Sequence, residues 1–102
     1  MGSYKLTRLA ERDVLEIWTY IAEDNVGAAD LVLDYLHDQC LLLSKMPAMG
    51  RLREDFAPNL YVMPVGKNSW RSRYLIFYRP TALGIEVIRI LEGHRNITEE
   101  LF

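Results

Sequence analysis

Arginine is concentrated in the second half of this sequence, and its spacing there suggests anion recognition. Residues 51–102 contain seven arginines, against two in residues 1–50. They are Arg51, Arg53, Arg71, Arg73, Arg79, Arg89 and Arg95. A planar guanidinium pairs with carboxylates and phosphates through two parallel hydrogen bonds. Two interpretations remain open: a solvated sheet face with scattered ion pairs, or a basic face that binds an RNA backbone or an acidic protein segment.

Side chains that commonly perform covalent or acid–base catalysis form no recognisable motif. The sequence has no phosphate-binding glycine loop, no zinc-protease helix motif and no nucleophile elbow. His37 is expected on a helix surface, and Cys40 lies in an apolar stripe, where a thiol is usually inert. The acidic side chains of the first predicted helix are expected to be solvated; they are Glu11, Asp13, Glu16 and Glu23. We therefore expect no cofactor and no metal centre.

Length and composition are those of one globular domain over residues 1–102. Half of the residues are hydrophobic, a quarter are charged, and the formal net charge is -2. No stretch approaches the roughly 18 apolar residues that a membrane-spanning helix needs. The single cysteine excludes an internal disulfide. The first residues lack an apolar export signal, so we expect a cytoplasmic protein.

Two amphipathic helices are predicted in the first half of the chain, after a short extended segment at residues 4–6. The first helix should span residues 8–24, with Thr7 as its N-cap. The second should span residues 27–45, because Pro47 prevents continuation. The short link between them predicts an antiparallel helical hairpin. The second helix has more apolar residues than one buried stripe needs, and the additional ones are Leu31, Tyr35, Leu41 and Leu42.

The second half is predicted to form strands. Residues 60–65 form a weak strand at an edge or bulge, because Pro64 cannot donate a ladder hydrogen bond. Residues 66–69 form a turn, and residues 70–79 alternate as a strand. Residues 80–84 are predicted as a hairpin loop, so residues 85–91 should pair antiparallel with the preceding strand. One helical layer on one twisted antiparallel sheet gives an α+β fold.

Taken together, several segments in a specific order and spacing carry a family resemblance. They include Leu6-Thr7, Ala10-Glu11-Arg12-Asp13, Glu16-Ile17-Trp18, Tyr20-Ile21-Ala22, and residues 47–51, 74–80 and 84–91. This pattern resembles the ParE toxins of the RelE/ParE superfamily of toxin–antitoxin modules and covers nearly the whole chain. The resemblance implies a helical hairpin packed on a twisted antiparallel sheet. It also implies a ParD-like antitoxin whose C-terminal segment folds along the toxin and masks it.

The superfamily contains two activities, and three positions help to choose between them. RelE-like members cleave messenger RNA on the ribosome with a strand arginine, a C-terminal arginine and a nearby C-terminal tyrosine or histidine. By resemblance, Tyr74 stands at the strand-arginine position, Arg95 matches the C-terminal arginine, and Leu101 replaces the tyrosine. A leucine cannot serve as a general base. The resemblance therefore favours a non-enzymatic toxin that inhibits DNA gyrase and blocks replication.

Site residues follow from these expectations. A functional basic face is predicted from Arg51, Arg53, Tyr74, Arg79, Arg89 and Arg95. An antitoxin-binding surface on the helical hairpin is predicted from Trp18, Leu31, Tyr35 and Leu42. The expected assembly is a hetero-oligomer with the antitoxin, which would also carry any contact with DNA. Two alternatives remain: a ribosome-dependent endoribonuclease, and a decayed, non-toxic member kept as a co-regulator of its antitoxin.

Overall fold

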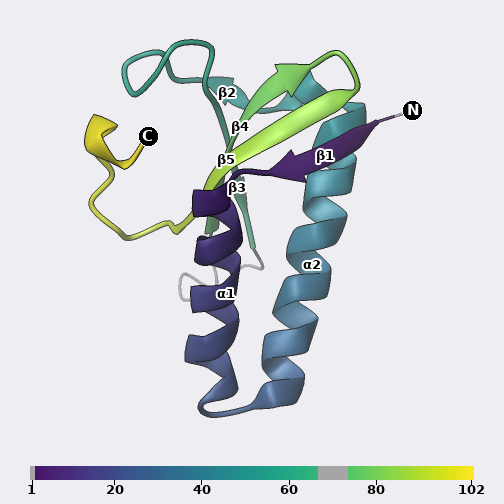
Figure 1. Cartoon of the computed structure of the whole chain (residues 1–102), viewed down its shortest axis with the longest axis vertical. Helices are drawn as coiled ribbons and strands as arrows, with labels where there is room; N and C mark the ends of the chain where they lie inside the picture. Colours follow the sequence, from purple (N-terminus) through teal and green to yellow (C-terminus); the bar gives the residue numbers. More distant parts are fainter. Residues whose placement is uncertain (1, 67–73) are drawn as a thin grey trace.

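The helical hairpin is the longest feature of the molecule (Figure 1). The computed structural model describes residues 2–66 and 74–102. Helix α1 (Arg8–Ala22) and helix α2 (Val26–Lys45) lie side by side and antiparallel, as predicted. Each begins at a side-chain cap: the Ala10 amide donates to Thr7 Oγ1, and the Ala28 amide donates to Asn25 Oδ1. These caps set where the helices start and keep the connection between them short.

A mixed sheet packs against the hairpin. Over the described residues its strands are β1 (Ser3–Leu6), β2 (Arg51–Leu52), β3 (Tyr61–Val65), β4 (Tyr74–Thr81) and β5 (Gly84–Glu92). Their order across the sheet is β1-β5-β4-β3-β2. The β3–β4 and β4–β5 pairs are antiparallel, as predicted. Strand β2, which was not predicted, is also antiparallel to β3, whereas β1 runs parallel to β5. The parallel pair is possible because a long stretch of chain, with both helices and strands β2, β3 and β4, lies between β1 and β5.

The turn between β4 and β5 is tighter than the predicted loop at residues 80–84. Thr81 pairs with Gly84, so the connection consists of Ala82 and Leu83. Gly84 has a φ of +154° and lies against β1, where an added Cβ would come within 1.9 Å of the Ser3 carbonyl oxygen. Glycine is therefore required for β1 to pair at this position.

The predicted edge position of Pro64 is confirmed. Strand β2 pairs only with Tyr61 and Val62, so within residues 2–66 and 74–102 the rest of β3 has no neighbouring strand on its outer side. Pro64 pairs with Leu75 of β4 on its inner side. A proline there removes an amide that would otherwise be available for pairing with another strand. The predictions for residues 67–73, including the turn, the start of the strand, Arg71 and Arg73, lie outside the described residues.

Both faces of the sheet carry a buried core, which contradicts one of the two interpretations left open by the sequence, a solvated sheet face. One core lies under the helices and includes Leu36, Leu43, Ile76 and Tyr78. A second core lies on the opposite face and includes Leu60, Val62, Phe77, Ile88 and Leu91.

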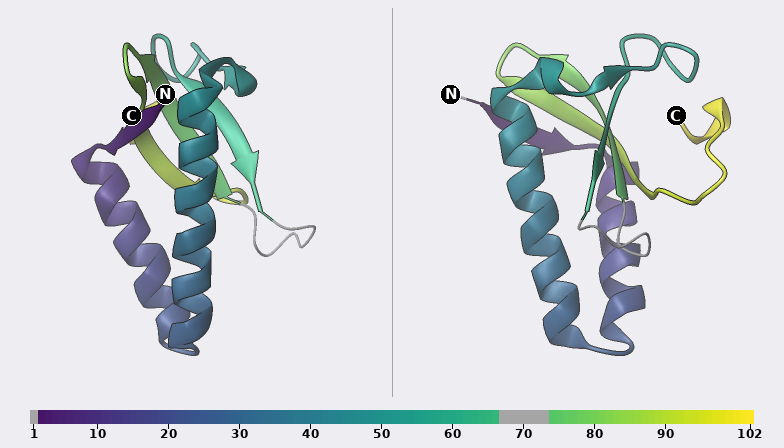
Figure 2. Two further views of the ribbon diagram at one scale, coloured as in Figure 1. Left: turned by 90° about the vertical axis from the view of Figure 1, so that its right-hand side faces the viewer. Right: turned by 180° about the vertical axis from the view of Figure 1, so that it is seen from behind.

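The second core is covered by two segments outside the main strands: the loop before β3 and the C-terminal segment with its 3-10 helix η3 (Glu99–Leu101). In the right-hand view of Figure 2 these two segments lie together, away from α2. Phe102 packs against Phe77 with ring centroids 4.6 Å apart and against Phe56 at 5.6 Å. The prediction missed this cover because its apolar residues lie outside any periodic element.

Candidate functional site

Arg89 of β5 forms a buried ion pair with Asp13 of α1. Its Nε and Nη2 donate to the two Asp13 carboxylate oxygens over 2.8 and 2.7 Å, and its Nη1 donates to the Leu101 carbonyl over 2.9 Å. Only 11% of the Arg89 side chain and 5% of the Asp13 side chain are exposed. The hydrogen bonds with Asp13 raise the pKa of Arg89. The expectation that Arg89 lies on an open basic face is therefore wrong, because the helix and the tail enclose it.

Two more predicted arginines hold the loop that precedes β3. Arg53 donates two hydrogen bonds to Asp55 and lies 4.3 Å from the centroid of the Phe56 ring. This pairing raises the pKa of Arg53 and lowers the pKa of Asp55. Arg79 of β4 donates from Nε to the Pro58 carbonyl over 3.0 Å. Arg51 of β2 is exposed. These contacts explain how the loop stays closed over the second core.

Tyr74 and Arg95 lie at the opposite end of the sheet from that loop. Tyr74 is directly across from Glu92 in the β4–β5 pair, and its ring packs against the helical core. Burial raises its pKa, and the Glu92 carboxylate adds to this effect. Arg95 follows in the turn after β5, where its amide donates to the Glu92 carbonyl. The predicted basic face is thus divided: Arg89 is in the ion pair, Arg53 and Arg79 hold the loop before β3, and Tyr74 and Arg95 lie at the other end of the sheet. Contact of any of these residues with a target stays a prediction.

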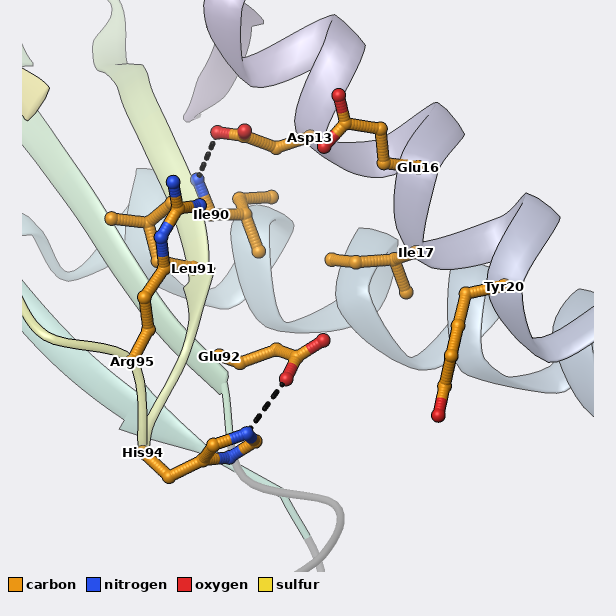
Figure 3. Close-up of a pocket in the computed structure, with 9 residues that line it drawn as sticks. All are labelled: Asp13, Glu16, Ile17, Tyr20, Ile90, Leu91, Glu92, His94 and Arg95. Atoms are coloured by element: carbon orange, nitrogen blue, oxygen red, sulfur yellow. Dashed lines mark hydrogen bonds and ion pairs between the residues drawn. The ribbon is translucent and has the colours of Figure 1, made fainter.

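An open groove with a volume of about 540 Å³ lies between α1 and the end of β5 (Figure 3). It is lined by Asp13, Glu16, Ile17, Tyr20, Ile90, Leu91, Glu92, His94 and Arg95. Its floor is apolar and its rim carries both signs of charge. In Figure 3 the Glu92 side chain points from β5 toward α1, and its carboxylate is 3.1 Å from His94 Nε2. This arrangement can accept a polar side chain above an apolar floor.

Sequence reasoning placed Asp13 on a solvated face, and the structure corrects this. Asp13 is 4% exposed and belongs to the buried stripe of α1, together with Ala10 and Ile17. It also accepts a hydrogen bond from the Ile90 amide over 3.1 Å. The signal was its spacing, three residues after Ala10 and four before Ile17, which is the spacing of one helix face. A carboxylate on that face needed a cation from elsewhere, and Arg89 supplies it.

The four residues predicted to bind the antitoxin do not form one surface: three lie on α2, and Trp18 lies on α1. Leu31 and Leu42 are 70% and 42% exposed on α2, and Tyr35 between them is partly buried. The Gly66 amide donates to the Tyr35 hydroxyl, which ties the end of β3 to this helix. Trp18 instead lies between the helices, where its indole N–H donates to Asp30 over 2.9 Å. The helical spacing of Leu31, Tyr35 and Leu42 places these three on one face.

Further apolar side chains are exposed at the end of α2 and in the segment that follows it. Met46 and Met49 are 53% and 37% exposed where α2 ends and the 3-10 helix η1 (Pro47–Met49) follows, and Leu52 of β2 is 45% exposed. The Tyr78 hydroxyl holds this segment on the sheet, because it accepts from the Gly50 amide and donates to the Pro47 carbonyl. We call Leu31, Leu42, Met46, Met49 and Leu52 the α2 apolar surface.

Comparison with known proteins identifies the family. A family model described as the ParE toxin of the type II toxin–antitoxin system parDE matches residues 4–97. The chain belongs to the ParE toxin family. A solved structure described as the chromosomal ParDE TA system from P. aeruginosa is 22% identical, with a TM-score of 0.65 over 90% of this chain and 96% of that chain. The search of curated proteins found no match.

Membership of the ParE family confirms the resemblance seen in the sequence, and the structural likeness confirms the α+β fold. The chain is a toxin of a type II toxin–antitoxin module, which implies an antitoxin partner. Neither helix in the described part of the chain has the length and hydropathy needed to cross a membrane. The same residues contain no cluster of His, Cys, Asp or Glu side chains arranged to hold a metal ion.

Proposed function

We propose that this ParE-family toxin inhibits DNA gyrase without catalysing a reaction, and that a ParD-like antitoxin neutralises it. The absence of catalysis is supported by Tyr74, Arg95 and Leu101, which stand at the positions where RelE-like nucleases would have their catalytic side chains. Arg95 borders the groove, but Tyr74 packs against the helical core and Leu101 against the second core. The Leu101 carbonyl also accepts a hydrogen bond from the Arg89 guanidinium. An apolar, packed side chain cannot take a proton from a ribose hydroxyl.

The electrostatics of the groove also argue against RNA cleavage there. Glu16 and Glu92 line it together with Arg95. Carboxylates close to a bound phosphodiester would oppose the charge that develops in the transition state, whereas nucleases concentrate cations there. The ribonuclease alternative therefore has less support than the gyrase hypothesis.

The α2 apolar surface supports the second part of the proposal. Its side chains are exposed on a toxin whose family works with an antitoxin. Lys45 and Arg51 flank the segment from Met46 to Leu52 along the chain, and both are exposed. An amphipathic antitoxin segment with apolar residues on one side and acidic residues beside them would match this surface. The toxin would then contact DNA only through its antitoxin, in a hetero-oligomeric complex.

A supercoiling assay tests the gyrase proposal. Purified toxin is added to gyrase and relaxed plasmid, with and without an excess of the antitoxin encoded beside it. We expect supercoiling to be lost with toxin alone and restored by antitoxin. Relaxation of the supercoiled form of this plasmid by an unrelated topoisomerase should not change, which controls for nonspecific DNA effects.

Other outcomes would select an alternative. Unchanged supercoiling together with codon-specific cleavage of ribosome-bound messages would identify a ribonuclease. Unchanged supercoiling without cleavage, and expression without growth arrest, would identify a non-toxic co-regulator. In both cases binding of the antitoxin would still be expected, so a pull-down of the co-expressed pair is measured in parallel.

A further inference from the structure

The groove between α1 and β5 has an excess of negative charge. Asp13 and Glu16 on α1 both line the groove, and Asp13 forms the ion pair with Arg89 beside it. Asp13 accepts three hydrogen bonds from Arg89 and Ile90 and is fully engaged. Glu16 is exposed and has no ion pair within the described residues. It therefore remains able to pair with a cation from outside.

Glu92 adds a second carboxylate from the opposite wall. Its side chain is 47% exposed, and its ion-pair partner among the described residues is His94, which is charged only when protonated. Arg95 lies on the same side of the groove. The charged groups are the carboxylates of Asp13, Glu16 and Glu92 and the guanidiniums of Arg95 and the neighbouring Arg89. With His94 neutral, the groove and its surroundings therefore carry a net charge of -1.

An aromatic wall completes the groove. Tyr20 of α1 is 74% exposed, and in Figure 3 its ring extends from the helix beside Ile17. The floor beneath consists of Ile17 and Ile90, which are 8% and 2% exposed. A cation over a tyrosine ring is attracted to the face of the ring, and guanidinium also stacks on it. An apolar floor suits the methylene stem of a long basic side chain.

We propose that this groove binds an arginine side chain from a segment of the antitoxin, with the guanidinium between Glu16 and Glu92 and stacked on Tyr20. The inference rests on the proposed antitoxin partnership and adds a second contact, separate from the α2 apolar surface. Arginine fits better than lysine, because a planar fork can bond two carboxylates while its face lies on an aromatic ring. Arg95 at the rim favours an acidic residue next to that arginine.

A small probe tests the groove without the antitoxin. N-acetyl-arginine amide is titrated into labelled toxin and followed by the amide resonances of Tyr20 and Glu92. We expect saturable shifts with a dissociation constant on the order of 1–10 mM. N-acetyl-citrulline amide, which has nearly the same shape without the charge, should produce no saturable shift. Equal binding of citrulline would overturn the proposal.

Paired variants then separate a specific site from general charge attraction. The double variant Glu16→Gln/Glu92→Gln should weaken arginine-amide binding at least about fivefold. Glu11→Gln/Glu23→Gln makes the same change in net charge on exposed positions of α1 and its C-cap, and it should leave binding unchanged. Equal weakening by both pairs would mean that the probe responds only to net charge, which contradicts the proposal.

The last measurement uses the antitoxin itself. Glu16→Gln/Glu92→Gln should raise the dissociation constant of the toxin–antitoxin complex at least about tenfold, and more at low salt than at high salt. If the wild-type toxin binds antitoxin and the variant binds equally well, the groove is not the arginine site but the proposed function stands. If the wild-type toxin does not bind antitoxin, the proposed partnership fails, and the assignment of the arginine to an antitoxin fails with it.

Discussion

Arg89 and Asp13 are separated by 76 positions in the chain, yet they form the double hydrogen bond that joins the sheet to the first helix. Strand β1 pairs with β5 only as far as Val87, so the following part of β5 has no neighbouring strand on that side among the residues that the structure describes. Asp13 takes the place of that strand, because it accepts the Ile90 amide as well as the Arg89 guanidinium. Through Leu101, the same arginine also holds the C-terminal segment. One ion pair therefore connects a helix, a strand and the tail.

Asp13→Asn should destabilise the fold strongly. It leaves the Arg89 charge uncompensated in a largely buried position, and breaking such a pair costs about 3–5 kcal/mol. The free energy of unfolding from urea titration measures the effect. Glu11→Gln, an exposed position on the same helix, should change it by less than about 0.5 kcal/mol. The apolar double variant Asp13→Leu/Arg89→Met should recover part of the loss, and a single-variant loss below about 1 kcal/mol would contradict this role for the pair.

Gly84→Ala should disrupt the pairing of β1 with β5. The added Cβ meets the Ser3 carbonyl oxygen, and the φ of +154° is strained for alanine. A cost of about 2–3 kcal/mol in the free energy of unfolding is expected. At Gly27 near the start of α2, a Cβ would meet only Asn25 Oδ1 at 3.3 Å, so Gly27→Ala should stay within about 1 kcal/mol of wild type. Similar costs for both variants would show that close approach of β1 is not the cause.

Cys40 should make the fold less stable at alkaline pH. Burial raises the pKa of its thiol from 9.0 to about 12. The folded protein therefore keeps a proton that the unfolded chain loses above pH 9, so stability is full below that pH and falls as the pH rises toward 12. The expected loss is about 1.4 kcal/mol per pH unit within this window. Urea titrations of wild type and Cys40→Ala at pH 8 and pH 10 measure it, and the variant should lack this part of the decline.

Substitutions on the α2 apolar surface should weaken antitoxin binding without unfolding the toxin. Leu42→Gln combined with Met46→Gln removes two exposed apolar contacts and should raise the dissociation constant at least about tenfold. The free energy of unfolding should change by less than about 0.5 kcal/mol, because both side chains are exposed. Leu15→Gln is the matched control, since Leu15 is 63% exposed on α1 outside this surface. Unchanged affinity in the double variant would place the antitoxin elsewhere.

Local rules predicted the elements well. Thr7 was predicted as a helix cap, because its side chain accepts an amide hydrogen bond three residues ahead, which depends only on neighbouring positions. Asn25 caps the second helix in the same way, although it was predicted only as part of the connection. Pro64 marks an edge because it lacks an amide proton, whatever surrounds it. The pairing of β4 with β5 followed from two alternating segments joined by a short loop. The functional residues were harder, because their state depends on partners far away in the chain.

The sequence by itself therefore determined the helices, the antiparallel strands and the family, since each depends on spacing along the chain. Only the tertiary structure decided which charged residues are available. Arg89 looked like its neighbouring arginines in the sequence, but it is enclosed because Asp13 and the tail lie against it. Glu16, four residues from Tyr20 on α1, became part of a groove only because the end of β5 lies opposite. Exposure and charge pairing arise from contacts between distant segments, and no local pattern records them.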